Sequence, residues 1–149
     1  MATPGERQGE RGLLGAPSIS LRVTPWFEYV VEGHVARYVR PVSGNMAGVV
    51  PLGWRIHARG RSQPYLSMGA GLVWTDFTGL RGIDQQRNYL TQIGAGVRRL
   101  RTDGSVVSVE ARFFHLSNLS SAPPNLGMEV FAVLVGYRPA AHDRRDSRR

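Results

Sequence analysis

Apolar residues alternate with small or polar ones along most of this chain. The alternation occurs in segments of about 12 residues, and turns separate one segment from the next. Successive side chains of a β-strand point to opposite faces, so a period of two predicts strands rather than helices. Because short turns join neighbouring segments, we expect an antiparallel sheet. In the clearest segment, from Gln63 to Thr75, one face holds Leu66, Met68, Ala70, Leu72 and Trp74, and the other Ser67, Gly69, Gly71 and Thr75.

Five further segments follow the same period, and we expect strands at residues 18–31, 46–57, 88–100, 105–117 and 128–139. Pro25 interrupts the first of them and indicates a bulge or an unpaired edge position. Residues 34–40 either continue that strand or form a short seventh one. In 46–57 the alternation places one set of residues on one face, Gly48, Val50, Leu52, Trp54 and Ile56, and another set opposite, Val49, Gly53, Arg55 and His57.

Glycine decides between the two all-β architectures that this pattern allows. The chain has 18 glycines, many of them on the strand face opposite the apolar one. Water-facing strand positions of a soluble sandwich would carry Lys, Thr and Glu, whereas small residues suit the crowded interior of a narrow barrel. No apolar run reaches the roughly 18 residues of a membrane helix, but a membrane strand needs only about 9–11. We therefore expect an antiparallel, up-and-down membrane β-barrel.

Charge and composition divide the chain into a leader, one domain and a tail. The formal net charge of +8 favours an anionic partner, such as nucleic acid, phospholipid or lipopolysaccharide. We expect a disordered leader at residues 1–17, the barrel at 18–139 and a disordered basic tail at 140–149. The leader lacks the apolar core of a signal peptide. The chain has no cysteine, which excludes disulfides, thiolate metal sites and a thiol nucleophile.

Three ionisable or nucleophilic residues fall on the apolar face of the last two predicted strands. His115 and Ser117 share a face because they lie two positions apart, and Glu129 opens the apolar face of the next strand. A hairpin turning near residue 122 would place His115 opposite Glu129. The same parity turns Glu110 and Arg112 to the interior, where they can pair.

This grouping suits acyl transfer by a serine nucleophile. His115 would act as the general base for Ser117, and Glu129 would orient the imidazole. Asn118, Asn125 and backbone amides of residues 118–127 could stabilise the oxyanion. An ordinary interfacial histidine with a cross-strand salt bridge is the alternative, but polar groups that face lipid without a function are costly.

The residues His115-Leu-Ser117-Asn118 and Asn125-Leu-Gly127-Met-Glu129 resemble the signature of the lipid A 3-O-deacylases, the PagL-type family. The segments PYLSMGAGLVWTD and QIGAGVR are similar to its central strands, and the resemblance covers residues 45–139. It implies an eight-stranded barrel in the bacterial outer membrane that hydrolyses the 3-position acyl ester of lipid A without a cofactor or metal. It also implies Ser117, His115 and Glu129 as a triad on the barrel exterior, with Asn125, Asn118 and Gly127 in support.

The strand count departs from this family, because about six strands are visible here. An open sheet would leave two unpaired edges in lipid, so we expect that the given start is internal and that a leader and one hairpin precede it. A non-catalytic small outer-membrane barrel is the main alternative. A nucleic-acid-binding domain is disfavoured because aromatic residues do not interleave with Arg or Lys on one strand face. Lipid A or lipopolysaccharide and membrane lipid are the expected partners; acyl-chain preference and oligomeric state, a homodimer included, stay open.

Overall fold

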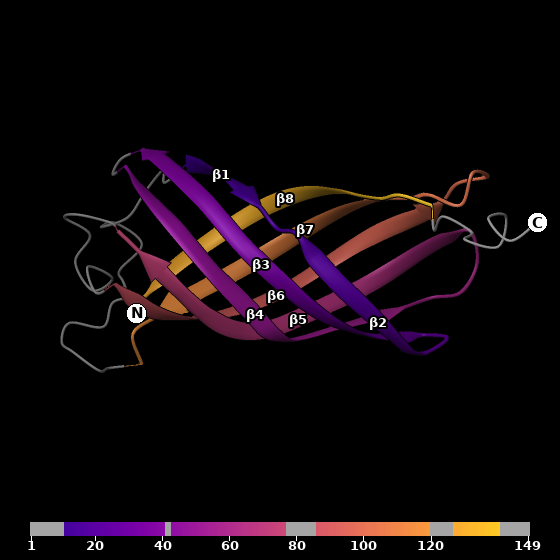
Figure 1. The fold of residues 1–149 in the computed structure, drawn as a ribbon, viewed down its shortest axis with the longest axis horizontal. Helices are drawn as coiled ribbons and strands as arrows, with labels where there is room; N and C mark the ends of the chain where they lie inside the picture. Colours follow the sequence, from indigo (N-terminus) through magenta and orange to yellow (C-terminus); the bar gives the residue numbers. More distant parts are fainter. Residues whose placement is uncertain (1–10, 41–42, 77–85, 120–126, 141–149) are drawn as a thin grey trace, which may run out of the picture.

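The computed structural model describes residues 11–40, 43–76, 86–119 and 127–140, and all regular structure in these ranges is β-strand (Figure 1). Within them, no helix is long and apolar enough to cross a membrane. The strands are β1 Arg11–Gly15, β2 Ser18–Thr24, β3 Phe27–Arg40, β4 Gly44–His57, β5 Ser62–Thr75, β6 Arg87–Leu100, β7 Val106–Ser117 and β8 Met128–Arg138.

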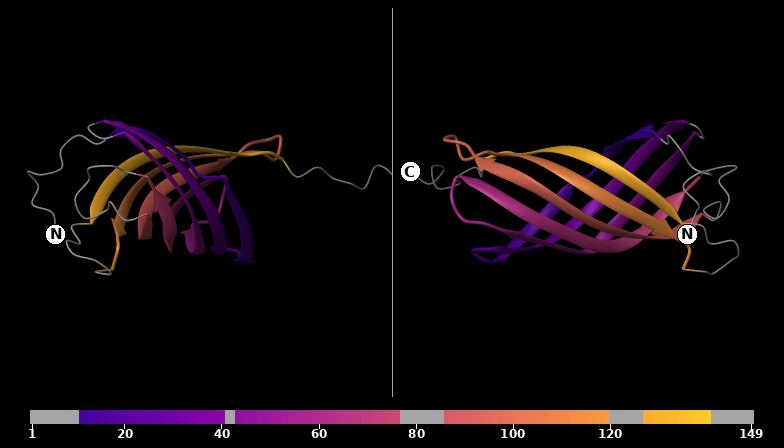
Figure 2. Two further views of the ribbon diagram at one scale, coloured as in Figure 1. Left: turned by 60° about the vertical axis from the view of Figure 1, so that its left-hand side comes forward. Right: turned by 180° about the vertical axis from the view of Figure 1, so that it is seen from behind.

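The strands form one antiparallel sheet in which each strand from β3 to β8 lies beside the next along the chain. Both β1 and β2 pair with β3, so they form one edge of the sheet, and β8 forms the other. The sheet is curled into a half-barrel (Figure 2). The predicted all-β antiparallel architecture is therefore confirmed. We call the end near Trp26, Gly60 and Asp103 the short-turn end, and the opposite end, where residues 76–86 and 118–127 connect strands, the long-loop end.

The predicted leader is wrong where it meets the sheet, because residues 11–15 form β1. Pro17 lies between β1 and β2 and has no N–H, so it cannot donate a hydrogen bond to β3. Its carbonyl oxygen accepts a hydrogen bond from the Gly33 amide at 2.8 Å. Gly12 permits the close approach to β3, since a Cβ there would lie 2.5 Å from the Arg37 carbonyl oxygen. Residues 1–10 and 141–149, the rest of the predicted leader and most of the predicted tail, lie outside the described residues.

Proline also explains two errors in the predicted strands. Pro25 lies in a turn that separates β2 from β3, so it ends a strand instead of interrupting one. Pro51 lies where the pairing of β4 shifts register with both of its neighbours. This bulge changes which face the side chains occupy, so Val50 is buried whereas Leu52 is exposed. The predicted grouping of Gly48 and Val50 with Leu52 is therefore wrong.

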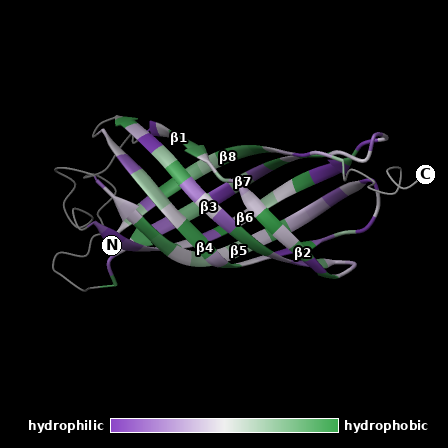
Figure 3. Ribbon diagram, viewed as in Figure 1, coloured by the Kyte–Doolittle hydropathy of each residue, from purple (hydrophilic) through white to green (hydrophobic). Residues whose placement is uncertain are grey.

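The outer face of the sheet is apolar over most of its area. Alternation of apolar and polar residues is visible along the strands in Figure 3. Val135 of β8 is 83% exposed and Ile93 of β6 56% exposed, although both are aliphatic. Such an outer face would be unfavourable in water, but it matches the predicted hydrocarbon surroundings.

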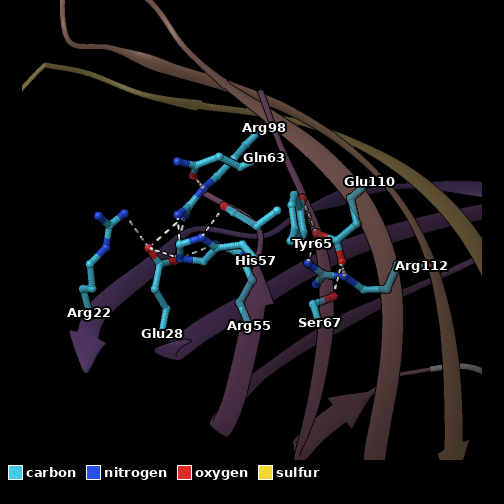
Figure 4. Close-up of polar contacts among 11 residues, drawn as sticks. Arg22, Glu28, Arg55, His57, Gln63, Tyr65, Ser67, Arg98, Glu110 and Arg112 are labelled. Atoms are coloured by element: carbon cyan, nitrogen blue, oxygen red, sulfur yellow. Dashed lines mark hydrogen bonds and ion pairs between the residues drawn. The ribbon is translucent and has the colours of Figure 1, made fainter. Parts of the chain in front are cut away.

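The inner face has a polar half toward the short-turn end and an apolar half toward the long-loop end. In the first polar group, the guanidinium of Arg98 donates to Glu28 at 2.8 and 2.9 Å and lies 2.8 Å from His57 Nε2 (Figure 4). The apolar half is a cluster of buried side chains to which Val50, Leu90 and Leu116 belong. A curved sheet of this size thus fills its concave side with two kinds of contact.

A second polar group lies farther along the inner face and centres on Arg112. Its guanidinium donates to Glu110 at 2.7 and 3.0 Å and also bonds Glu32 from β3. Glu110 accepts further hydrogen bonds from Tyr65 at 2.8 Å and Ser67 at 2.5 Å. The predicted pairing of Glu110 with Arg112 on the interior is confirmed.

Candidate functional site

The candidate site lies on the outer face of β6, β7 and β8, toward the long-loop end. The register pairs His115 of β7 with Glu129 of β8, which confirms the predicted opposition of these two residues. On its other side, His115 lies opposite Thr91 of β6, and Ser117 lies opposite Tyr89. Directly opposed side chains on one face have Cβ atoms about 4.5–5.5 Å apart, so His115 and Glu129 are close enough to interact.

The three predicted catalytic residues differ in their exposure. Glu129 is exposed, His115 is half-buried, and Ser117, at the end of β7, is 8% exposed. In the described part of the chain, no hydrogen bond joins their side chains to one another. Catalytic hydrogen bonds are often long or poorly aligned in a free enzyme and tighten in its complex with substrate, so this geometry is compatible with a triad.

Gly127 is held against the imidazole of His115. Its φ of +61° lies in the left-handed region that favours glycine. A Cβ at this position would lie 3.0 Å from His115 Cε1 and 3.3 Å from the carbonyl oxygen of Leu116. Because Gly127 has no side chain, the imidazole ring of His115 can lie against its backbone. Gly127 is two residues before Glu129 in the chain.

Apolar groups surround the three residues. Phe113 and Phe131, on the same face as His115, pack edge to face with ring centroids 5.7 Å apart. Phe131 is 77% exposed and Tyr89 46% exposed. An apolar molecule that lies along the outer face can thus reach His115 without leaving an apolar environment.

The predicted supporting residues are only partly within the described structure. Asn118 follows Ser117 directly and is 2% exposed. Asn125, the other candidate oxyanion donor, lies outside the described residues. Across the described ranges, no three His, Asp or Glu side chains are grouped so that they could hold a metal ion.

Sequence reasoning did not single out Tyr89 and Thr91 as part of this surface. Both face outward from β6, but their place beside Ser117 and His115 depends on the register between β6 and β7. The strand period gives the face of a residue and not its neighbour across the sheet, so the sequence held no signal for this pairing.

The arrangement offers a hydroxyl, an imidazole and a carboxylate on one apolar surface, the groups that serine-dependent acyl transfer uses.

A family model described as lipid A 3-O-deacylase (PagL) matches residues 16–138. No curated protein sequence matches the chain significantly. A solved structure described as the outer membrane enzyme PagL is similar with a TM-score of 0.70 and 17% identity, over 86% of this chain and 90% of that one. That likeness shows a shared fold. Because the family model spans most of the sequence, the chain belongs to the PagL family of lipid A 3-O-deacylases.

Proposed function

We propose that the protein is an outer-membrane serine esterase that removes the ester-linked acyl chain at position 3 of lipid A. The reaction would take place on the exterior of the sheet, with Ser117 as nucleophile, His115 as general base and Glu129 as the group that orients the imidazole. The observation that carries this proposal is the pairing of His115 with Glu129 on the outer face, beside Ser117.

Each residue has a distinct part in the proposed mechanism. His115 takes the proton of the Ser117 hydroxyl while the oxygen attacks the ester carbonyl, and later returns a proton to the departing alcohol oxygen. Water then hydrolyses the acyl-serine by the same base, which releases the fatty acid. Glu129 stabilises the imidazolium that forms in each step. Asn118, Asn125 and the Gly127 amide are the proposed donors to the oxyanion.

The position along the strands supports lipid A as the substrate class. Bacterial outer-membrane barrels have short periplasmic turns and longer extracellular loops, and the trio lies toward the long-loop end. In that orientation Ser117 would lie near the outer leaflet. The exposed apolar side chains around it suit an acyl chain that stays in the bilayer.

The test is mass spectrometry of lipid A from cells before and after expression of the protein. Wild-type protein should produce lipid A that has lost one 3-hydroxyacyl group, and Ser117→Ala should leave the lipid unchanged while accumulating in the membrane at the same level. Equal loss of the acyl group with both proteins would exclude Ser117 as the nucleophile. No loss with either protein would favour a non-catalytic barrel.

Gly127→Ala is expected to lower kcat for deacylation about 10- to 100-fold and to change KM much less. The added Cβ would displace the His115 ring, and small misplacements of catalytic groups carry costs of this order. Gly104→Ala is the matched control, since Gly104 also has a positive φ, +82°, but lies in the β6–β7 turn at the opposite end. Equal losses of activity in the two variants would mean that backbone strain alone, and not the position of His115, is responsible.

A further inference from the structure

A charged side chain lies on the outer face of β6, beside the candidate site, and takes no part in the proposed mechanism. Arg87 is exposed and faces the same way as Tyr89, which follows it two positions along the strand. Among the described residues, no hydrogen bond or ion pair engages the guanidinium of Arg87. Its N–H donors are therefore available to a ligand.

Two observations place Arg87 where the apolar band of the outer face ends. Arg87 and Arg99 lie at the two ends of the outward-facing row of β6, which is uncharged between them. At about 3.4 Å per residue and a tilt of about 40°, they are separated by roughly 30 Å along the membrane normal, the thickness of a hydrocarbon core. Trp74 of β5 is 48% exposed and pairs with Arg87, and Tyr89 lies next to it, as in the aromatic girdles of membrane barrels. Arg87 therefore lies at the height of the lipid headgroups at the long-loop end.

The register places Arg87 within reach of a molecule that contacts Ser117. Tyr89 lies directly opposite Ser117, so Arg87 is the diagonal neighbour of Ser117 on the side away from the hydrocarbon. Diagonal neighbours in an antiparallel pair are about 7–8 Å apart, a distance that a long side chain can span. One substrate molecule can therefore contact the Ser117 hydroxyl and the Arg87 guanidinium at the same time.

The proposed substrate carries an anion at the matching place. In lipid A, the sugar that carries the 3-position ester also carries a phosphate on its anomeric carbon, and one ring carbon separates the two positions. When that ester lies at Ser117, the phosphate lies close by, at the level of the headgroups. A guanidinium can donate two parallel hydrogen bonds to a phosphate, so arginine suits this contact better than lysine does.

We propose that Arg87 binds the phosphate of the same sugar whose acyl ester Ser117 cleaves, and that this contact sets the depth and orientation of the substrate. The inference rests on the proposed function for the identity of the lipid, but binding of the phosphate requires no catalysis. Arg87 is then a specificity-determining residue, because it favours the phosphorylated lipid over an uncharged lipid that presents the same ester.

The test compares two substrates in mixed detergent micelles: lipid A with both phosphates, and lipid A from which the anomeric phosphate has been removed. Arg87→Met should raise KM for the first substrate about tenfold, the effect of losing one hydrogen bond between charged groups, and should change kcat by less than about threefold. Wild-type protein should show the same rise in KM when the phosphate is removed from the lipid. Arg87→Met should lose nothing further on that second substrate.

Two further variants serve as controls. Arg99→Met removes the exposed arginine at the other end of the same outward-facing row, and it should leave KM for both substrates unchanged. Arg87→Lys keeps the charge but loses the paired donors of the guanidinium, so its KM for the first substrate should lie between those of wild type and Arg87→Met.

Two results would overturn the proposal. One is a KM of Arg87→Met that equals the wild-type value, or that rises equally for both substrates, since Arg87 would then have no contact with the phosphate. The other is an equal rise in KM for the first substrate with Arg99→Met and with Arg87→Met, which would mean that positive charge anywhere on the protein attracts the anionic lipid.

A binding measurement separates this proposal from the proposed function. Native mass spectrometry of Ser117→Ala with each lipid gives the two affinities without turnover. If wild-type protein leaves lipid A intact, but Ser117→Ala binds the phosphorylated lipid more tightly and loses this preference on addition of Arg87→Met, the phosphate site is retained and the esterase is contradicted. Deacylation of both lipids by wild-type protein with the same KM would retain the esterase and contradict the phosphate site.

Discussion

His115→Ala is expected to lower kcat for deacylation of lipid A by about 10³-fold or more, because Ser117 would lose the base that removes its proton. Glu129→Gln should cost less, about 10- to 100-fold, because the amide oxygen can still accept a hydrogen bond from His115, and only the charge that stabilises the imidazolium is lost. The measurement is the rate of 3-hydroxy fatty acid release from purified lipid A by each variant in detergent micelles.

The control for this series is Val109→Ala. Val109 faces outward from β7, as His115 does, but lies toward the short-turn end and is 55% exposed. We expect its activity to stay within about threefold of wild type, because surface substitutions away from special features have small effects. If His115→Ala retained more than a tenth of the wild-type rate, a base other than His115 would have to serve Ser117.

The sequence predicted the pairing of the last two strands better than it predicted the other edge of the sheet. A strand period of two requires only local information, and the register with β6 likewise has His115 and Ser117 two positions apart on one strand face. The predicted pairing of His115 with Glu129 required one assumption, that the hairpin turns near residue 122. The position of the turn fixes which residues of the two strands lie opposite each other. Neither step depended on how the rest of the sheet was arranged.

Features that depend on distant strands had no comparable signal. Pro51 reverses the faces of β4, and a period continued through a bulge gives the wrong side for Val50. The five residues of β1 carry two consecutive leucines, which show no alternation, yet Leu13 is exposed and Leu14 packs against the buried apolar cluster. The contact between Glu32 and Arg112 joins strands that are far apart in the chain, and it depends on the curvature of the whole sheet.

Arg112→Met is expected to destabilise the folded protein by about 3–5 kcal/mol, the cost of removing one partner from a buried ionic group. Arg112 is 3% exposed and bonds both Glu32 and Glu110, so its loss leaves two buried carboxylates without their shared cation. The measurement is the free energy of unfolding in urea, in detergent micelles.

Arg101→Met is the control. Arg101 Nε lies 3.6 Å from Asp103 Oδ2 in an exposed ion pair, which should contribute less than about 1 kcal/mol to the free energy of unfolding. Adding Glu32→Gln and Glu110→Gln to Arg112→Met should recover part of the loss, because it removes the unpaired charges. Equal effects of Arg112→Met and Arg101→Met would mean that water, and not Arg112, stabilises the interior carboxylates.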